Sequence, residues 1–115
     1  MALSTGSGSQ SSRAYTGVGP KHAFIFSGVS SPVVTNVIGL DITVAQTDDP
    51  GKYTVTHNLG HTNYVGIFTS EDNAAATNPT NVRIYNRAAN TCQVWIEDDA
   101  GALTNPDFVH GVIYD

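Results

Sequence analysis

Apolar and polar residues alternate with a period of two over much of this chain. In the clearest stretch, Tyr53 and Val55 alternate with Lys52, Thr54 and Thr56, which is the pattern of a strand with one buried face. The same reasoning predicts strands at residues 21–27, 33–38, 40–44, 52–56, 64–68, 82–84, 92–96 and 108–114. About eight short strands joined by turns predict an all-β fold, an antiparallel β-sandwich of jelly-roll-like type.

Residues that favour turns separate the predicted strands. Asp48-Asp49-Pro50-Gly51 breaks the chain, and Asn58 and Gly60 both tolerate positive φ values. The chain is therefore predicted to reverse over Asn58–Asn63, so that residues 51–68 form a hairpin of two strands. Further reversals are predicted at residues 28–32, 86–90, 98–101 and 105–106.

The first twenty residues, MALSTGSGSQSSRAYTGVGP, differ in composition from the rest. They are rich in Ser, Gly and Thr and have little to bury, so this arm is expected to be ordered only when a partner surface holds it. The chain is thus divided into an extended N-terminal arm, residues 1–20, and a β-sandwich domain, residues 21–115. The predicted anchors of the arm are Leu3, Arg13, Tyr15 and Val18.

Three predicted strands carry large apolar side chains at both parities, around Phe24, Tyr64 and Phe108. Either loops cover their outer faces or those faces meet a neighbouring subunit, and the second alternative predicts a homo-oligomer. The partner-binding residues predicted within the sandwich are Phe24, Phe26, Tyr64, Phe108 and Tyr114.

Charge is scarce and acidic. Charged residues make up 13% of the chain, against roughly 25% in typical soluble domains, and such a surface is often buried in an assembly. The net charge is −5, and the five cations are scattered along the sequence, so no basic stripe for nucleic acid is predicted. No apolar run is long enough to span a bilayer, and the first residues do not resemble a signal peptide, which predicts a cytoplasmic product.

Few residues suggest chemistry. His57 and His61 are four apart, but the stretch between them lacks a catalytic glutamate, so hydrogen-bonding loop histidines are preferred over a zinc site completed by His22 or His110. The carboxylates of Glu97–Asp99 are read as a solvated turn, and Cys92 as a small buried hydrophobe. We expect no enzyme activity and no cofactor. A sugar-binding aromatic platform is kept as an alternative, with the rings of Tyr64, Tyr85, Trp95 and Tyr114.

The stretch GxYTVTHNLGxTxY at Gly51–Tyr64, together with the closing strand DFVHGVIYD at Asp107–Asp115, resembles the small β-sandwich modules of tailed-phage virion proteins. Such modules occur in head-decoration proteins and at the ends of tail fibres. The resemblance covers roughly residues 51–115. It is a similarity of sequence pattern and includes no catalytic signature.

The resemblance implies a place in a virion. The preferred interpretation is a capsid decoration, or cement, protein that binds the major capsid protein on the outer head surface as a homotrimer. The alternative is a tail-fibre or baseplate receptor-binding module that recognises a host surface glycan. A secreted lectin-like or adhesion domain is a third interpretation, which the missing signal peptide and the absence of a second cysteine disfavour.

Overall fold

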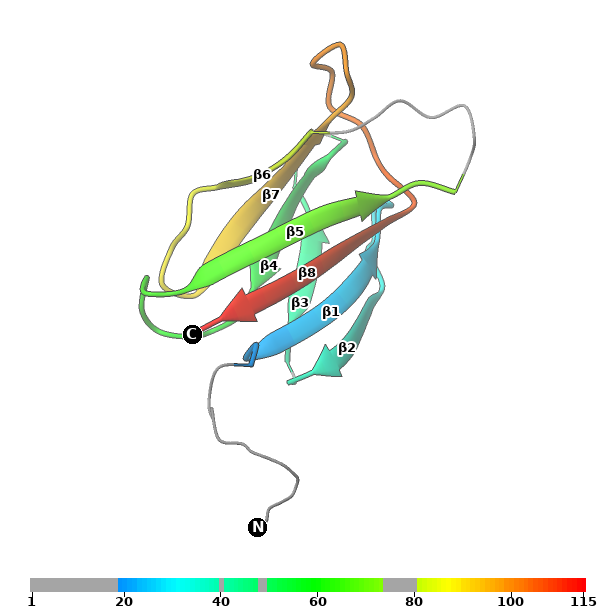
Figure 1. Ribbon diagram of the computed structural model, residues 1–115. Coiled ribbons are helices and arrows are strands. Elements are labelled where there is room, and N and C mark those ends of the chain that lie inside the picture. The colour runs from blue at the N-terminus through cyan, green and yellow to red at the C-terminus, as the bar shows by residue number, and fades with distance from the viewer. Residues whose placement is uncertain (1–18, 40, 48–49, 74–80) are drawn as a thin grey trace.

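Eight strands form the fold in the computed structural model, which describes residues 19–39, 41–47, 50–73 and 81–115 (Figure 1). Because successive side chains point to opposite faces, most strands alternate between buried and more exposed residues. The strands are β1 (His22–Ser27), β2 (Val34–Ile38), β3 (Thr43–Gln46), β4 (Lys52–Thr56), β5 (Val65–Glu71), β6 (Asn81–Tyr85), β7 (Thr91–Glu97) and β8 (Phe108–Tyr114).

The strands make two four-stranded antiparallel sheets that pack face to face (Figure 1). Sheet A has the order β2-β1-β8-β5, and sheet B has the order β3-β4-β7-β6. The predicted all-β antiparallel sandwich is therefore confirmed. As in a jelly roll, the first and last strands are neighbours. The hairpins β1–β2, β3–β4 and β6–β7 each stay within one sheet.

The prediction of a hairpin over residues 51–68 is wrong. β4 pairs with β3 and β7 in sheet B, whereas β5 pairs with β8 in sheet A. The intervening loop does contain the two expected positive φ values, 56° at Asn58 and 83° at Gly60, but it carries the chain from one sheet to the other. Alternation identifies a strand and its buried face, and it does not say which sheet the strand joins.

The core lies between the sheets and centres on three aromatic rings. The Phe26 ring lies 5.2 Å from the Tyr53 ring and 6.4 Å from the Phe24 ring, so rings from the two sheets meet in the middle. The Tyr53 hydroxyl donates to Asn105 Oδ1 at 3.0 Å, and burial raises the pKa of Tyr53 to about 12. The buried hydrophobic residues are Phe24, Phe26, Ile42, Tyr53, Val55, Tyr64, Cys92, Val94, Ile96, Val109 and Ile113.

Asn105 ties the loop between β7 and β8 to sheet B. Its Oδ1 accepts hydrogen bonds from the Gln46 side chain at 2.6 Å, from the Gly51 backbone at 2.8 Å and from Tyr53. In the same loop, Asp98 Oδ1 accepts from the backbone N–H groups of Ala100 and Ala102, both at 2.9 Å. The predicted turn at residues 98–101 thus uses the Asp98 carboxylate to hold its own backbone.

Candidate functional site

The outer face of sheet A is apolar. The pairing register places Ile67, Val112, Ala23 and Ile38 in one row across the four strands, on the side away from the core. Thr69, His110, Ile25 and Thr35 form the next row. We call this surface, with its flanking residues Val37, Val65, Phe108 and Tyr114, the A face.

Large exposed hydrophobic side chains concentrate on the A face. Val37 is 65% exposed, Val65 is 58% exposed and Ile67 is 56% exposed, although β-branched side chains of this size are usually covered. A hollow of about 290 Å³ opens on this face around the small Ala23, and Ile25, Val37, Ile67 and Val112 contribute to its lining. The hydrophobic side chains exposed on strands of sheet A are Val37, Ile38, Val65, Ile67, Phe108 and Tyr114.

One ion pair interrupts the A face. His110 Nε2 lies 2.6 Å from Glu71 Oε1, a contact between neighbouring strands β8 and β5. Apart from the Tyr114 hydroxyl, these are the outward-facing titratable side chains within the described strands of sheet A. The contact satisfies a polar group on each side chain, and the pair is neutral overall when His110 is protonated.

The outer face of sheet B is polar and carries a cation–aromatic cluster. The register puts Lys52, Trp95 and Arg83 in one row across β4, β7 and β6. Lys52 Nζ lies 4.4 Å from the Trp95 ring centroid, and the Tyr85 ring stacks on Trp95 at 4.3 Å. Two cations that look scattered in sequence thus meet at a single ring, and Arg83 also pairs with Glu97 at 3.2 Å.

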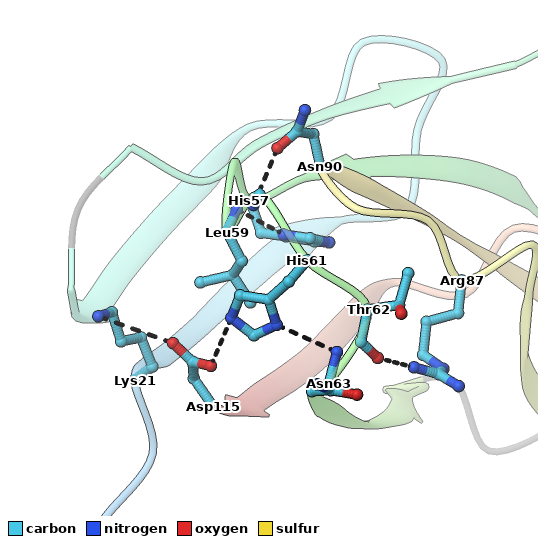
Figure 2. Close-up of polar contacts among 10 residues, drawn as sticks. Lys21, His57, Leu59, His61, Thr62, Asn63, Arg87, Asn90 and Asp115 are labelled. Carbon is cyan, nitrogen blue, oxygen red and sulfur yellow. Dashed lines mark hydrogen bonds and ion pairs between the residues drawn. The ribbon is translucent and has the colours of Figure 1, made fainter.

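The loop between β4 and β5 is held by polar contacts at one end of the sandwich (Figure 2). His57 N and Asn58 N both donate to the Asn90 carbonyl, at 2.9 and 3.1 Å. His61 Nδ1 accepts from Asn63 N at 3.0 Å, while His61 Nε2 lies 2.8 Å from Asp115 Oδ1. The two loop histidines therefore have structural contacts, as preferred from the sequence.

His57 and His22 are buried. His57 packs edge-on against the Tyr64 ring at 4.5 Å, and its Nδ1 accepts from Leu59 N at 3.2 Å. Burial lowers the pKa of both histidines; Lys21 adds to the effect at His22, and the Thr91 carbonyl opposes it at His57. Within the described ranges, no three residues among His, Cys, Asp and Glu gather to hold a metal ion.

The buried histidines predict a loss of stability in mild acid. The unfolded chain takes up protons at both histidines near pH 6.5, while the folded chain resists them, so the free energy of unfolding should fall as the pH drops below 6.5. Thermal unfolding between neutral pH and about pH 5, where most carboxylates stay ionised, measures this slope. His57→Gln should flatten part of this slope relative to the wild type, because it removes one of the two buried titrating groups; an unchanged slope in His57→Gln would contradict the assignment.

The predicted partner-binding residues separate into three groups. Phe24, Phe26 and Tyr64 are core residues with at most 5% exposure, so predicting them as partner contacts is wrong: their parity turns them inward, where Tyr64 OH donates to the Ala88 carbonyl at 2.8 Å. Phe108 and Tyr114 are exposed on the A face. The arm residues Leu3, Arg13, Tyr15 and Val18 lie outside the described residues.

Sequence reasoning missed the small centre of the A face and the two cations that lie beside the Trp95 ring. Ala23 could not be singled out from the sequence, because it lies in a hollow only relative to the larger side chains on the neighbouring strands. Cys92 was placed correctly: it is buried, and burial raises the pKa of its thiol to about 11, which keeps it protonated. Of the four rings considered as a platform, only Tyr85 and Trp95 stack on each other among the described contacts.

No known protein family, curated protein or solved structure matches this chain. In the part of the chain that the structure describes, no helix is long and apolar enough to cross a membrane.

Proposed function

We propose that the chain is a structural protein of a tailed-phage virion: a decoration, or cement, protein that binds the outer head surface and stabilises the shell. The contrast between the two outer faces carries this proposal. The A face is apolar, with side chains such as Val37 and Ile67 more than half exposed, and such a surface is expected to be covered in an assembly. The outer face of sheet B is polar and suits exposure to water.

In this proposal, two regions of the chain bind two different partners. The arm, residues 1–20, contacts the major capsid protein through Leu3, Arg13, Tyr15 and Val18, and the sandwich joins a homotrimer on the outer capsid surface. The protein is made in the host cytoplasm and adds after the shell forms. It acts by mass action, because a ligand that binds only the assembled lattice stabilises that lattice by RT ln(1 + [L]/Kd) for each site.

Particle stability tests the cementing role. Heads without this protein should break open at a lower temperature than decorated heads, and adding the purified full-length chain should restore the higher temperature. Genome release, followed with a dye that detects exposed DNA, measures the breaking point. Identical release temperatures with and without bound protein would rule out a cementing role.

A receptor-binding module of a tail fibre or baseplate is the second candidate, and the Trp95 cluster favours it. Stacked rings at 4.3 Å with Lys52 beside them form a polar, partly open surface on the face opposite the A face. Tyr85 is 45% exposed and offers a ring to a sugar of the host surface. This arrangement would engage a host surface glycan.

Two measurements separate the candidates. Trp95 is the only tryptophan, so its fluorescence should change when host polysaccharide binds beside it, and Tyr85→Ala should abolish that change. A receptor-binding module should also compete with whole phage for adsorption to host cells. A flat fluorescence titration together with unchanged adsorption would eliminate the second candidate and leave the first untouched.

A further inference from the structure

We propose that the A face is a self-association surface, which packs against the same face of further copies of this chain. This inference deepens the proposed homo-oligomer, on which it rests, by naming the surface that forms it. Contact with the capsid is then left to the arm.

The charge pattern of the A face suits a copy of itself. His110 and Glu71 already pair at 2.6 Å, and the rows around Ala23 and Ile25 carry no further charge. A symmetric interface brings each group close to its own copy, so any unpaired charge near the axis would repel itself. The A face keeps such charges few: the Glu71 carboxylate is hydrogen-bonded to His110, and the pair is neutral overall when His110 is protonated.

The shape of the A face also suits contact with the same face of a second copy. The hollow of about 290 Å³ around Ala23 lies beside the protruding side chains of Val37 and Ile67, on the two edge strands β2 and β5. When two copies meet, an edge side chain of one copy can fill the hollow of the other. Sheets pack in this way at about 10 Å separation when their inner faces are apolar.

The size of the face sets the strength of association. Four strands spaced ~4.8 Å apart, with about six residues each at ~3.3 Å, present a flat area of ~400 Å². Two such areas together lie below the roughly 1,200 Å² of the smallest standard interfaces. Association should therefore be reversible and concentration-dependent in solution, and it should be strengthened where the lattice holds copies side by side.

Sedimentation velocity of the purified full-length chain, without heads, tests the inference over a wide range of concentration. The wild type should shift from monomer to a larger species as concentration rises. Ile67→Glu and Val37→Glu place a charge on exposed positions of the A face and should weaken association at least tenfold. Ala45→Glu adds the same charge at an exposed position on edge strand β3 of sheet B and should leave association unchanged; circular dichroism confirms that each variant is folded.

The outcomes distinguish other occupants of the A face. A wild type that stays monomeric, or association that Ile67→Glu and Ala45→Glu weaken equally, overturns the inference. If the chain is monomeric alone but Ile67→Glu abolishes binding to heads, the shell covers the A face, and the proposed function survives without this inference. If removal of residues 1–18 is needed before copies associate, the arm covers the face, and the inference is again wrong.

Discussion

Phe26→Ala should lower the free energy of unfolding by about 3–5 kcal/mol. Phe26 is fully buried, and its ring lies between Phe24 of its own strand and Tyr53 of the opposite sheet. Truncation would open a cavity that the flat sheets cannot close, because their spacing is fixed by all the other side chains between them. Since domains are typically stable by only about 5–15 kcal/mol, the Phe26→Ala variant should retain only a small free energy of unfolding.

Urea unfolding followed by Trp95 fluorescence measures this loss. Phe26→Leu fills most of the space and should cost less than half as much as Phe26→Ala. Val33→Ala, at a residue 71% exposed beside the same sheet, should change stability by no more than about 0.5 kcal/mol. Similar losses for Phe26→Ala and Val33→Ala would mean that the aromatic centre is not the main support of the sandwich.

Gly51→Ala should destabilise the fold by about 2–5 kcal/mol, the sum of a left-handed backbone cost of ~1–2 kcal/mol and an overpacking cost of ~1–3 kcal/mol. Gly51 has a φ of 76°, and a Cβ there would lie 2.5 Å from the Ile96 carbonyl oxygen and 2.7 Å from that of Thr104. Both are backbone atoms. The added methyl group should therefore disturb the hydrogen bond from Ile96 N to Gly51 O, 2.8 Å long.

Gly101→Ala separates the two costs. Its φ of 86° is similar, but a Cβ at Gly101 would meet nothing within 4 Å. This variant should lose only the backbone cost, ~1–2 kcal/mol. Equal losses in the two variants would show that the Ile96 and Thr104 carbonyl groups move away from the added methyl group without measurable cost.

The sequence could predict the strands because most of them have one buried face. β4, β7 and β8 alternate cleanly, and their inward residues, such as Val55, Val94 and Val109, have the expected parity. The pairing of the strands was harder to predict, because residues 58–63 suit a hairpin turn as well as a connection that crosses from one sheet to the other. The structure pairs β5 with β8 in sheet A, and the alternation of apolar and polar residues does not specify that pairing.

The A face was only half predictable. Large residues at both parities around Phe24 correctly indicated a sheet that is apolar on both sides, but nothing in the pattern says which parity faces inward. The structure turns Phe24 and Phe26 into the core and leaves Ile25 and Ala23 outside. The Trp95 cluster depends on the register of three strands, which alternation does not fix.

The proposed decoration role is tested most directly by co-sedimentation with emptied, undecorated phage heads. Full-length protein should pellet with the heads and saturate a fixed number of lattice sites. A folded variant lacking residues 1–20 should stay in the supernatant, and Ala45→Glu should bind like the wild type. Failure of the full-length chain to pellet at any concentration would contradict the proposed decoration role and favour the receptor-binding candidate.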